Sequence, residues 1–166
     1  MPSSRVLMAI GMTDLGTLGG AESRESVAYG INDAGQVVGG SGTVNGTYHA
    51  FITGPDGVGM TDLGTLGGGH SAASGINDAG QVVGYSETDN GQDHAFITGQ
   101  NGAGMTDLGS VVNPPAGYFS DATDINNHGQ LAVLGEVSVV PEPEMYAMLL
   151  LGLGLIGFLA HGRTAA

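Results

Sequence analysis

The sequence contains no cysteine and no lysine, and lysine plus arginine supply only 3 of its 166 residues. The lack of cysteine excludes disulfides, thiolate metal sites and a cysteine nucleophile. The formal net charge of −13 excludes a nucleic-acid partner, because binding to a phosphate backbone depends on lysine and arginine. Such acidity suits a soluble extracellular surface, and loose attraction of divalent cations is the alternative interpretation.

The first residues also lack the features of a secretion signal. Residues 1–11 read MPSSRVLMAIG, in which only Val6 to Ile10 form an apolar stretch. A signal peptide needs an apolar region of roughly 7–15 residues and a small-residue cleavage site. We therefore treat residues 1–10 as a separate segment, and we expect either a misplaced start or a piece of a longer gene.

Residues 11–139 are built from internal repeats. The word GMTDLG begins at residues 11, 59 and 104, and INDAGQVVG begins at residues 31 and 76, with a degraded copy, INNHGQLAV, at 125. Residues 31–64 and 76–109 are identical at 26 of 34 positions. The GMTDLG words start 48 and 45 residues apart, a period typical of β-propeller blades.

The spacing between these words separates constant segments from a variable one. IND precedes HAF by 18 residues and HAF precedes GMTDLG by 10 in both copies, whereas GMTDLG precedes IND by 20, 17 and 21 residues. Constant spacing indicates rigid hairpins, and variable spacing indicates surface loops that tolerate insertion. The sequence therefore predicts surface loops at residues 68–74 and 109–120.

Each repeat is predicted to hold four short strands in two hairpins. Residues 32–35, Asn-Asp-Ala-Gly, favour a tight turn in which Gly35 adopts a positive φ. The second hairpin turns at 54–57 in one copy and at 100–102 in the next, where Pro-Asp-Gly and Asn-Gly are strong turn signals. The predicted fold class is all-β: repeated four-stranded antiparallel units in a partial β-propeller-like array, followed by one C-terminal transmembrane helix.

Apolar residues that recur at the same place in each copy are the candidate core. One unit alone buries too little area to be stable, so neighbouring units are expected to cover one another. The candidates are Ile31, Val37, Val38, Phe51, Ile52, Met60 and Leu63, with their equivalents Ile76, Val82, Val83, Phe96, Ile97, Met105 and Leu108.

Several repeated words together resemble one known family. The word TDLGTLGG occurs at 13–20 and at 61–68, and GINDAGQVVG occurs at 30–39 and at 75–84. The chain resembles the HAF family of probable extracellular repeats over about residues 11–135. The resemblance implies a secreted bacterial β protein without a defined catalytic activity. The family triplet is His49, Ala50 and Phe51 in one copy and His94, Ala95 and Phe96 in the other.

The number of repeats raises a separate question. At most three units are present, whereas propellers have about 4–8 blades. We therefore expect an open array, self-association with other copies, or a longer parent chain. An open glycine-rich strand edge favours pairing with another edge, which makes self-association the second choice.

Residues 140–166 form a three-part tail that resembles the PEP-CTERM signal. A V-P-E-P word is followed by an uncharged apolar run at 145–160 and then by a basic residue. The resemblance implies recognition by exosortase, a membrane peptidase of Gram-negative bacteria, and removal of the tail after export; a permanent anchor is the alternative. The signal residues would be Val140, Pro141, Glu142, Pro143 and Arg163.

The apolar run suits a short membrane anchor. Sixteen residues rise about 24 Å as a helix, against a hydrocarbon core of roughly 30 Å. We therefore predict a helix at 145–160 in the inner membrane. Arg163 would lie on the cytoplasmic side and the repeats outside.

No enzyme is expected, because the sequence has no P-loop, GxSxG or HExxH motif. The histidines of the HAF triplet recur with the repeat, which favours a structural role at a strand start.

Calcium is the one cofactor considered: the oxygens of Asp33, Asp78 and Asp124 suit a hard cation, but their spacing departs from an EF-hand. Turn formation explains these residues without a metal.

Two functional hypotheses follow from this sequence. The first is an exported cell-surface or extracellular-matrix protein, structural or adhesive, that exosortase sorts through the tail. It would be anchored in the membrane first and extracellular or surface-bound after processing. The alternative is a ligand- or glycan-binding propeller fragment that uses the inter-repeat loops.

Overall fold

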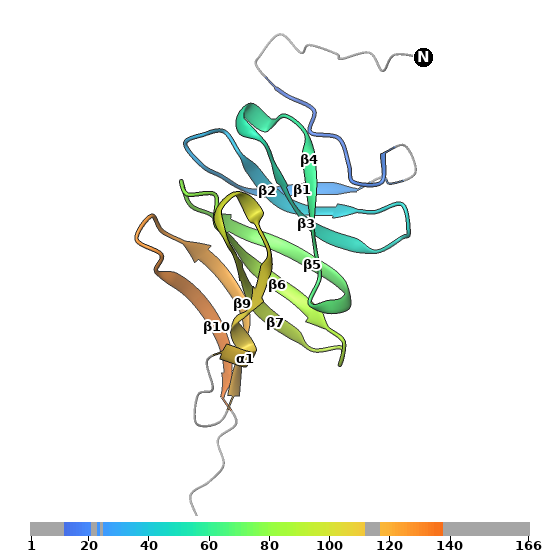
Figure 1. Cartoon of the computed structure of the whole chain (residues 1–166). Coiled ribbons are helices and arrows are strands. Elements are labelled where there is room, and N and C mark those ends of the chain that lie inside the picture. Colours follow the sequence, from blue (N-terminus) through green and yellow to red (C-terminus); the bar gives the residue numbers. More distant parts are fainter. Residues whose placement is uncertain (1–11, 21–22, 24, 112–116, 138–166) are drawn as a thin grey trace, which may run out of the picture. The chain divides into compact units, whose positions relative to one another are not determined.

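The computed structural model describes residues 12–20, 23, 25–111 and 117–137. Eight strands form one mixed sheet and two more form a hairpin (Figure 1). The elements are β1 (Ser26–Ile31), β2 (Val37–Gly42), β3 (Tyr48–Thr53), η2 (Pro55–Gly57), β4 (Met60–Gly64), β5 (Gly67–Ile76), β6 (Val82–Thr88), β7 (Asp93–Thr98), η3 (Gln100–Gly102), β8 (Met105–Asp107), α1 (Leu108–Val111), β9 (Gly117–Ile125) and β10 (Leu131–Val137).

The prediction of a β-rich fold is confirmed for these residues. The described strands close into neither a barrel nor a propeller, because the sheet keeps free edges at β1 and β8. The predicted N-terminal segment and the predicted membrane helix at 145–160 lie outside the described residues. In the part of the chain that is described, no helix is both long and apolar enough to cross a membrane.

The repeat copies fold alike. β1 to β4 pair in order as antiparallel neighbours, and β5 to β8 do the same. A parallel contact between Tyr48 of β3 and His70 of β5 joins the two sets. We call β1–β4 unit 1, β5–β8 unit 2 and the hairpin β9–β10 unit 3. Two antiparallel hairpins per full repeat is what the sequence predicts.

The first hairpin of every unit closes on the same asparagine-based turn. The Asn32 side-chain carbonyl accepts the backbone N–H of Gln36 at 3.0 Å, and the Asn32 amide donates to Gln36 Oε1 at 2.9 Å. Asn77 and Asn126 make the same two bonds in units 2 and 3. Gly35 has a φ of 71°, which side chains disfavour. The predicted turn is therefore confirmed.

Apolar side chains are buried mainly between units. Unit 2 packs one face against unit 1 and another against unit 3, as the inner units of repeat proteins do. The first interface buries Val38, Ala50 and Ile52 of unit 1 with Ala73, Ile76 and Val82 of unit 2. The second interface joins their equivalents, Val83, Ala95 and Ile97 of unit 2, with Ala122, Ile125 and Leu131 of unit 3.

The exposure of β1 corrects one core prediction. Ile31 is 69 % exposed, whereas its equivalent Ile76 is 9 % exposed. The reason is that β5 packs on unit 1, while β1 has no preceding unit on its outer side in the described structure. Other predicted core residues are half-buried: Val37, Met60, Leu63, Ile97, Met105 and Leu108.

The first variable segment is a strand and the second ends in one, which corrects the predicted surface loops at these residues. Residues 68–74 lie inside β5, and residues 117–120 of the second segment begin β9. Small residues allow this close packing: a Cβ on Gly84 would lie 2.0 Å from the Ala72 carbonyl oxygen on β5. Glycine, serine and alanine therefore mark a tight strand contact here.

Candidate functional site

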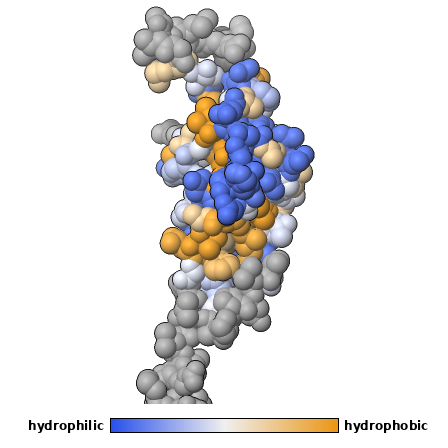
Figure 2. All heavy atoms as spheres, turned by 90° about the vertical axis from the view of Figure 1, so that its left-hand side faces the viewer, coloured by the Kyte–Doolittle hydropathy of each residue, from blue (hydrophilic) through white to orange (hydrophobic). Residues whose placement is uncertain are grey.

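A ladder of asparagine side chains links the three units at their turns. The Asn32 side-chain amide donates to the backbone carbonyl of Asn77 at 3.0 Å. The Asn77 amide in turn donates to the backbone carbonyl of Asn126 at 3.3 Å. Figure 1 shows the three turns one after another, and the surface over them is hydrophilic (Figure 2). Each unit thus donates to the next along the chain.

The residue after each asparagine forms a second ladder in the same direction. The Asp33 backbone N–H donates to Asp78 Oδ1 at 3.1 Å, and the Asp78 N–H donates to Asn127 Oδ1 at 2.9 Å. The Asn127 side-chain amide also donates to the Asp78 carboxylate. The polar atoms of these turns therefore bind neighbouring units, and we define Asn32, Asp33, Asn77, Asp78, Asn126 and Asn127 as the turn ladder.

The calcium candidates do not share one position in the repeat. Asp33 and Asp78 are equivalent, but their equivalent in unit 3 is Asn127, and Asp124 lies at the end of β9. The Asp124 carboxylate accepts the N–H of Ile125 at 2.8 Å. Among the described residues, no group of three or more histidine and acidic side chains is placed to hold a metal. Calcium binding stays a prediction.

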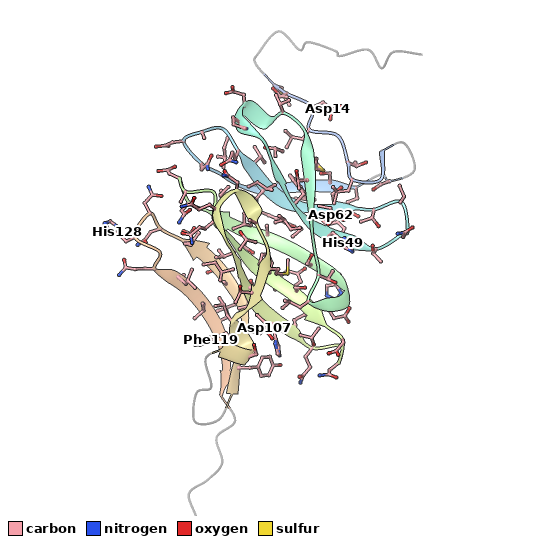
Figure 3. All side chains as sticks on the ribbon, viewed as in Figure 1. Asp14, His49, Asp62, Asp107, Phe119 and His128 are labelled. Atoms are coloured by element: carbon pink, nitrogen blue, oxygen red, sulfur yellow. The ribbon has the colours of Figure 1, made fainter. Side chains whose placement is uncertain are left out.

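Each HAF triplet places its histidine against the aspartate of the following TDLG word. His49 Nδ1 lies 2.9 Å from Asp62 Oδ2, across β3 and β4 (Figure 3). His94 Nδ1 lies 3.0 Å from Asp107 Oδ1, across β7 and β8. The alanine and phenylalanine of both triplets are fully buried. The triplet therefore anchors one hairpin, with its histidine linking the two strands.

The ionisation of Asp107 reflects this pairing. Burial raises the pKa of Asp107, but hydrogen bonds from His94 and from the backbone N–H groups of Ser110 and Gly109 outweigh it. The net effect is a pKa below the usual value of 3.8. Asp107 is therefore ionised at neutral pH and can hold the His94 ring in place.

Three tyrosines surround a hollow that sequence analysis did not predict. Tyr29, Tyr48 and Tyr85 line about 280 Å³ together with Ala72 and Ser74. Burial raises the pKa of Tyr48 and of Tyr85, and nearby acidic groups raise both further. Both phenols therefore keep their protons at neutral pH and can donate hydrogen bonds.

A signal for this hollow exists in the differences between the repeats. Tyr48 stands where unit 2 has Asp93, and Tyr85 stands where unit 1 has Gly40. Residues that break an internal repeat have no role in the shared packing, so they are candidates for a local function. Only the structure brings these tyrosines together, because they come from different hairpins.

The stacked β units and the turn ladder define a β-repeat protein, and comparison with known proteins characterises its tail. Residues 139–163 match the PEP-CTERM protein-sorting motif, a span that includes the predicted signal word and Arg163. That motif implies processing by exosortase and export to the cell surface. No curated protein and no solved structure matches the chain. Membership in the HAF family stays a prediction, and the tail lies outside the described residues.

Proposed function

We propose that this protein is a structural or adhesive component of the cell surface or extracellular matrix, built from HAF-type repeats and without catalytic activity. Exosortase would recognise its tail while the helix at 145–160 holds it in the inner membrane. The observation that carries the proposal is the direct junction of folded repeats and sorting motif: β10 ends at Val137, and the matched motif begins at 139.

The use of polar residues in the repeats supports a structural role. Polar side chains of the turn ladder that would be natural ligands bond to neighbouring units instead: the Asn32 and Asn77 amides donate to the next unit, and the Asp78 and Asn127 oxygens accept from the preceding one. The triplet histidines are likewise engaged by carboxylates on adjacent strands. A protein whose polar groups form contacts between its repeat units is suited to form a regular scaffold.

The sorting step is tested in a Gram-negative bacterium that carries an exosortase. Glu142→Gln removes the one charge of the V-P-E-P word, and Glu136→Gln is the matched control outside the matched residues. We expect the unaltered chain and the control to lose the tail by mass spectrometry and to reach the surface. Glu142→Gln should keep the tail and stay in the membrane fraction. Equal processing of both variants would contradict the proposal.

The three-tyrosine hollow supports glycan binding as a second candidate function. Tyrosine offers a flat apolar face and a hydroxyl at low entropic cost, which suits recognition of amphipathic ligands. The test is a glycan array probed with the full chain. Tyr29→Ala should abolish binding, whereas Val44→Ala, at a similarly exposed site, should leave it unchanged. Absence of binding by the unaltered chain would exclude this candidate.

A further inference from the structure

The outer face of unit 1 matches a face that is covered in the other two units. Ile31 is 69 % exposed, but its equivalents Ile76 and Ile125 are 9 % and 4 % exposed. Ala28 is exposed as well, while its equivalent Ala73 is fully buried. In units 2 and 3 this face is covered by the preceding unit. The structure therefore shows which kind of surface fits the exposed face of unit 1.

The uncovered face is also hollow. A depression of about 540 Å³ is lined by residues that include Leu15, Ala28, Ile31, Val37 and Gly57. On unit 2, the equivalent space is filled by side chains of unit 1: Val38, Ala50 and Ile52. The depression is therefore the place where the β2–β3 face of another unit would lie, and in unit 3 the described part of that face is β10, the equivalent of β2.

One part of that interface is already present. The Leu15 side chain lies 3.0 Å from the point that a Cβ on Gly57 would occupy, and Leu63 lies 2.7 Å from the same point on Gly102. Leu15 and Leu63 are the same residue of the GMTDLG word. The first GMTDLG word thus contacts unit 1 as β4 contacts unit 2, and the described residues supply no other part of a covering face.

The turn ladder points in the same direction. Each unit donates from its asparagine amide and from the next backbone N–H, and the following unit accepts. Among the described residues, the Asn32 carbonyl accepts the Gly35 N–H of its own turn but no bond from another unit, and the Asp33 carboxylate accepts none. At the other end, the equivalent donors of unit 3 are the Asn126 side-chain amide, which also bonds to Gln130 Oε1, and the Asn127 backbone N–H, and Leu134 is exposed.

We propose that unit 3 of one copy of this chain covers unit 1 of a second copy, because the acceptors and the hollow at the unit 1 end complement the turn donors and the exposed Leu134 at the unit 3 end. The contact joins two different surfaces and therefore propagates into an open, head-to-tail row of molecules. The inference rests on the proposed structural role and names its partner: a second copy of this chain.

The experiment measures the mass of the full chain in solution by light scattering as its concentration rises. The unaltered chain should grow in mass with concentration. Ile31→Glu and Leu134→Glu should each stay monomeric, whereas Val44→Glu, an equally charged change at an exposed turn, should associate like the unaltered chain. All three positions are exposed, so circular dichroism should show an unchanged fold.

Mixing the two monomeric variants tests the head-to-tail geometry. Each variant keeps one intact end, so an equimolar mixture should form a heterodimer and stop there. A Leu134→Glu variant that still dimerises alone would show a symmetric contact between two unit 1 faces. Growth of all variants alike would assign association to the apolar tail, and a monomeric unaltered chain would overturn the proposal. None of these outcomes affects the exosortase test, which measures tail removal.

Discussion

Unit 1 and unit 2 share most of their sequence and all of their hairpin chemistry, yet they differ in burial. The turn bonds of Asn32 and Asn77 have the same partners and nearly the same lengths. Ile31 and Ile76 nevertheless lie on an open and a covered face. The comparison shows that local residues determine the hairpin, whereas the neighbouring unit determines which side chains are buried.

The largest effect is expected at a position where the two units do not differ. Phe51 and Phe96 are both fully buried. Phe51→Ala and Phe96→Ala should each lower the free energy of unfolding by about 3–5 kcal/mol, because a large cavity replaces the ring. Urea denaturation measures both. A mild effect for Phe51→Ala alone would mean that unit 1 is not packed as described.

The next prediction uses a position where the two units differ most. Ile76→Ala should cost about 2–5 kcal/mol, since Ile76 is part of the interface between units 1 and 2. Ile31→Ala should change the stability of the monomer by less than about 0.5 kcal/mol, because surface substitutions have small effects. Urea denaturation at low protein concentration measures the change in the free energy of unfolding for each of the two variants. Equal costs would remove the distinction between open and covered faces.

The turn ladder gives a smaller contrast. Asn77→Ala removes the bonds within its turn and the bond to unit 3, and Asn77 is buried, so we expect a loss of about 1–3 kcal/mol. Asn126→Ala removes bonds within an exposed terminal turn and should cost about 0.5–1.5 kcal/mol. Thermal unfolding of both variants checks this order. The reverse order would contradict the inter-unit role of the ladder.

The smallest effect concerns pH. The pKa of Asp107 is lowered on folding, so Asp107 contributes stability that is present above its usual pKa of 3.8 and is lost as pH falls through the folded value. Asp107→Asn should therefore lose stability at neutral pH and flatten the decline at acidic pH. Unfolding midpoints measured across this range provide the check. An unchanged acid decline would show that another group causes it.

Sequence analysis predicted the features that depend on neighbouring residues in the chain. The Asn-Asp-x-Gly turns follow from side-chain bonding and a positive φ at Gly35, and the V-P-E-P word identified the sorting motif that the family comparison confirms. Mutual covering of the units was also predicted, since no unit has enough apolar area alone. The turns and the sorting word share a local cause, whereas the covering of the units was inferred from the small size of one repeat.

The details of packing between units were missed. β5 is rich in glycine, serine and alanine, so its composition predicts a loop, whereas close packing against the adjacent strand requires small residues. Ile31 is exposed because no unit among the described residues covers it, and no residue near Ile31 encodes that. The tyrosine hollow assembles from separate hairpins. Asp124 was grouped with Asp33 and Asp78 as a calcium candidate by residue type, although Asn127 is their equivalent in unit 3.

The central claim, that the same face is open in unit 1 and covered in unit 2, can be tested directly because the chain contains no cysteine. Ala28→Cys and Ala73→Cys place one thiol at equivalent positions on the two faces. At low protein concentration, a thiol-specific reagent should label Ala28→Cys as fast as an unfolded peptide. It should label Ala73→Cys only as fast as the protein opens. Equal labelling rates for the two folded variants would contradict the account.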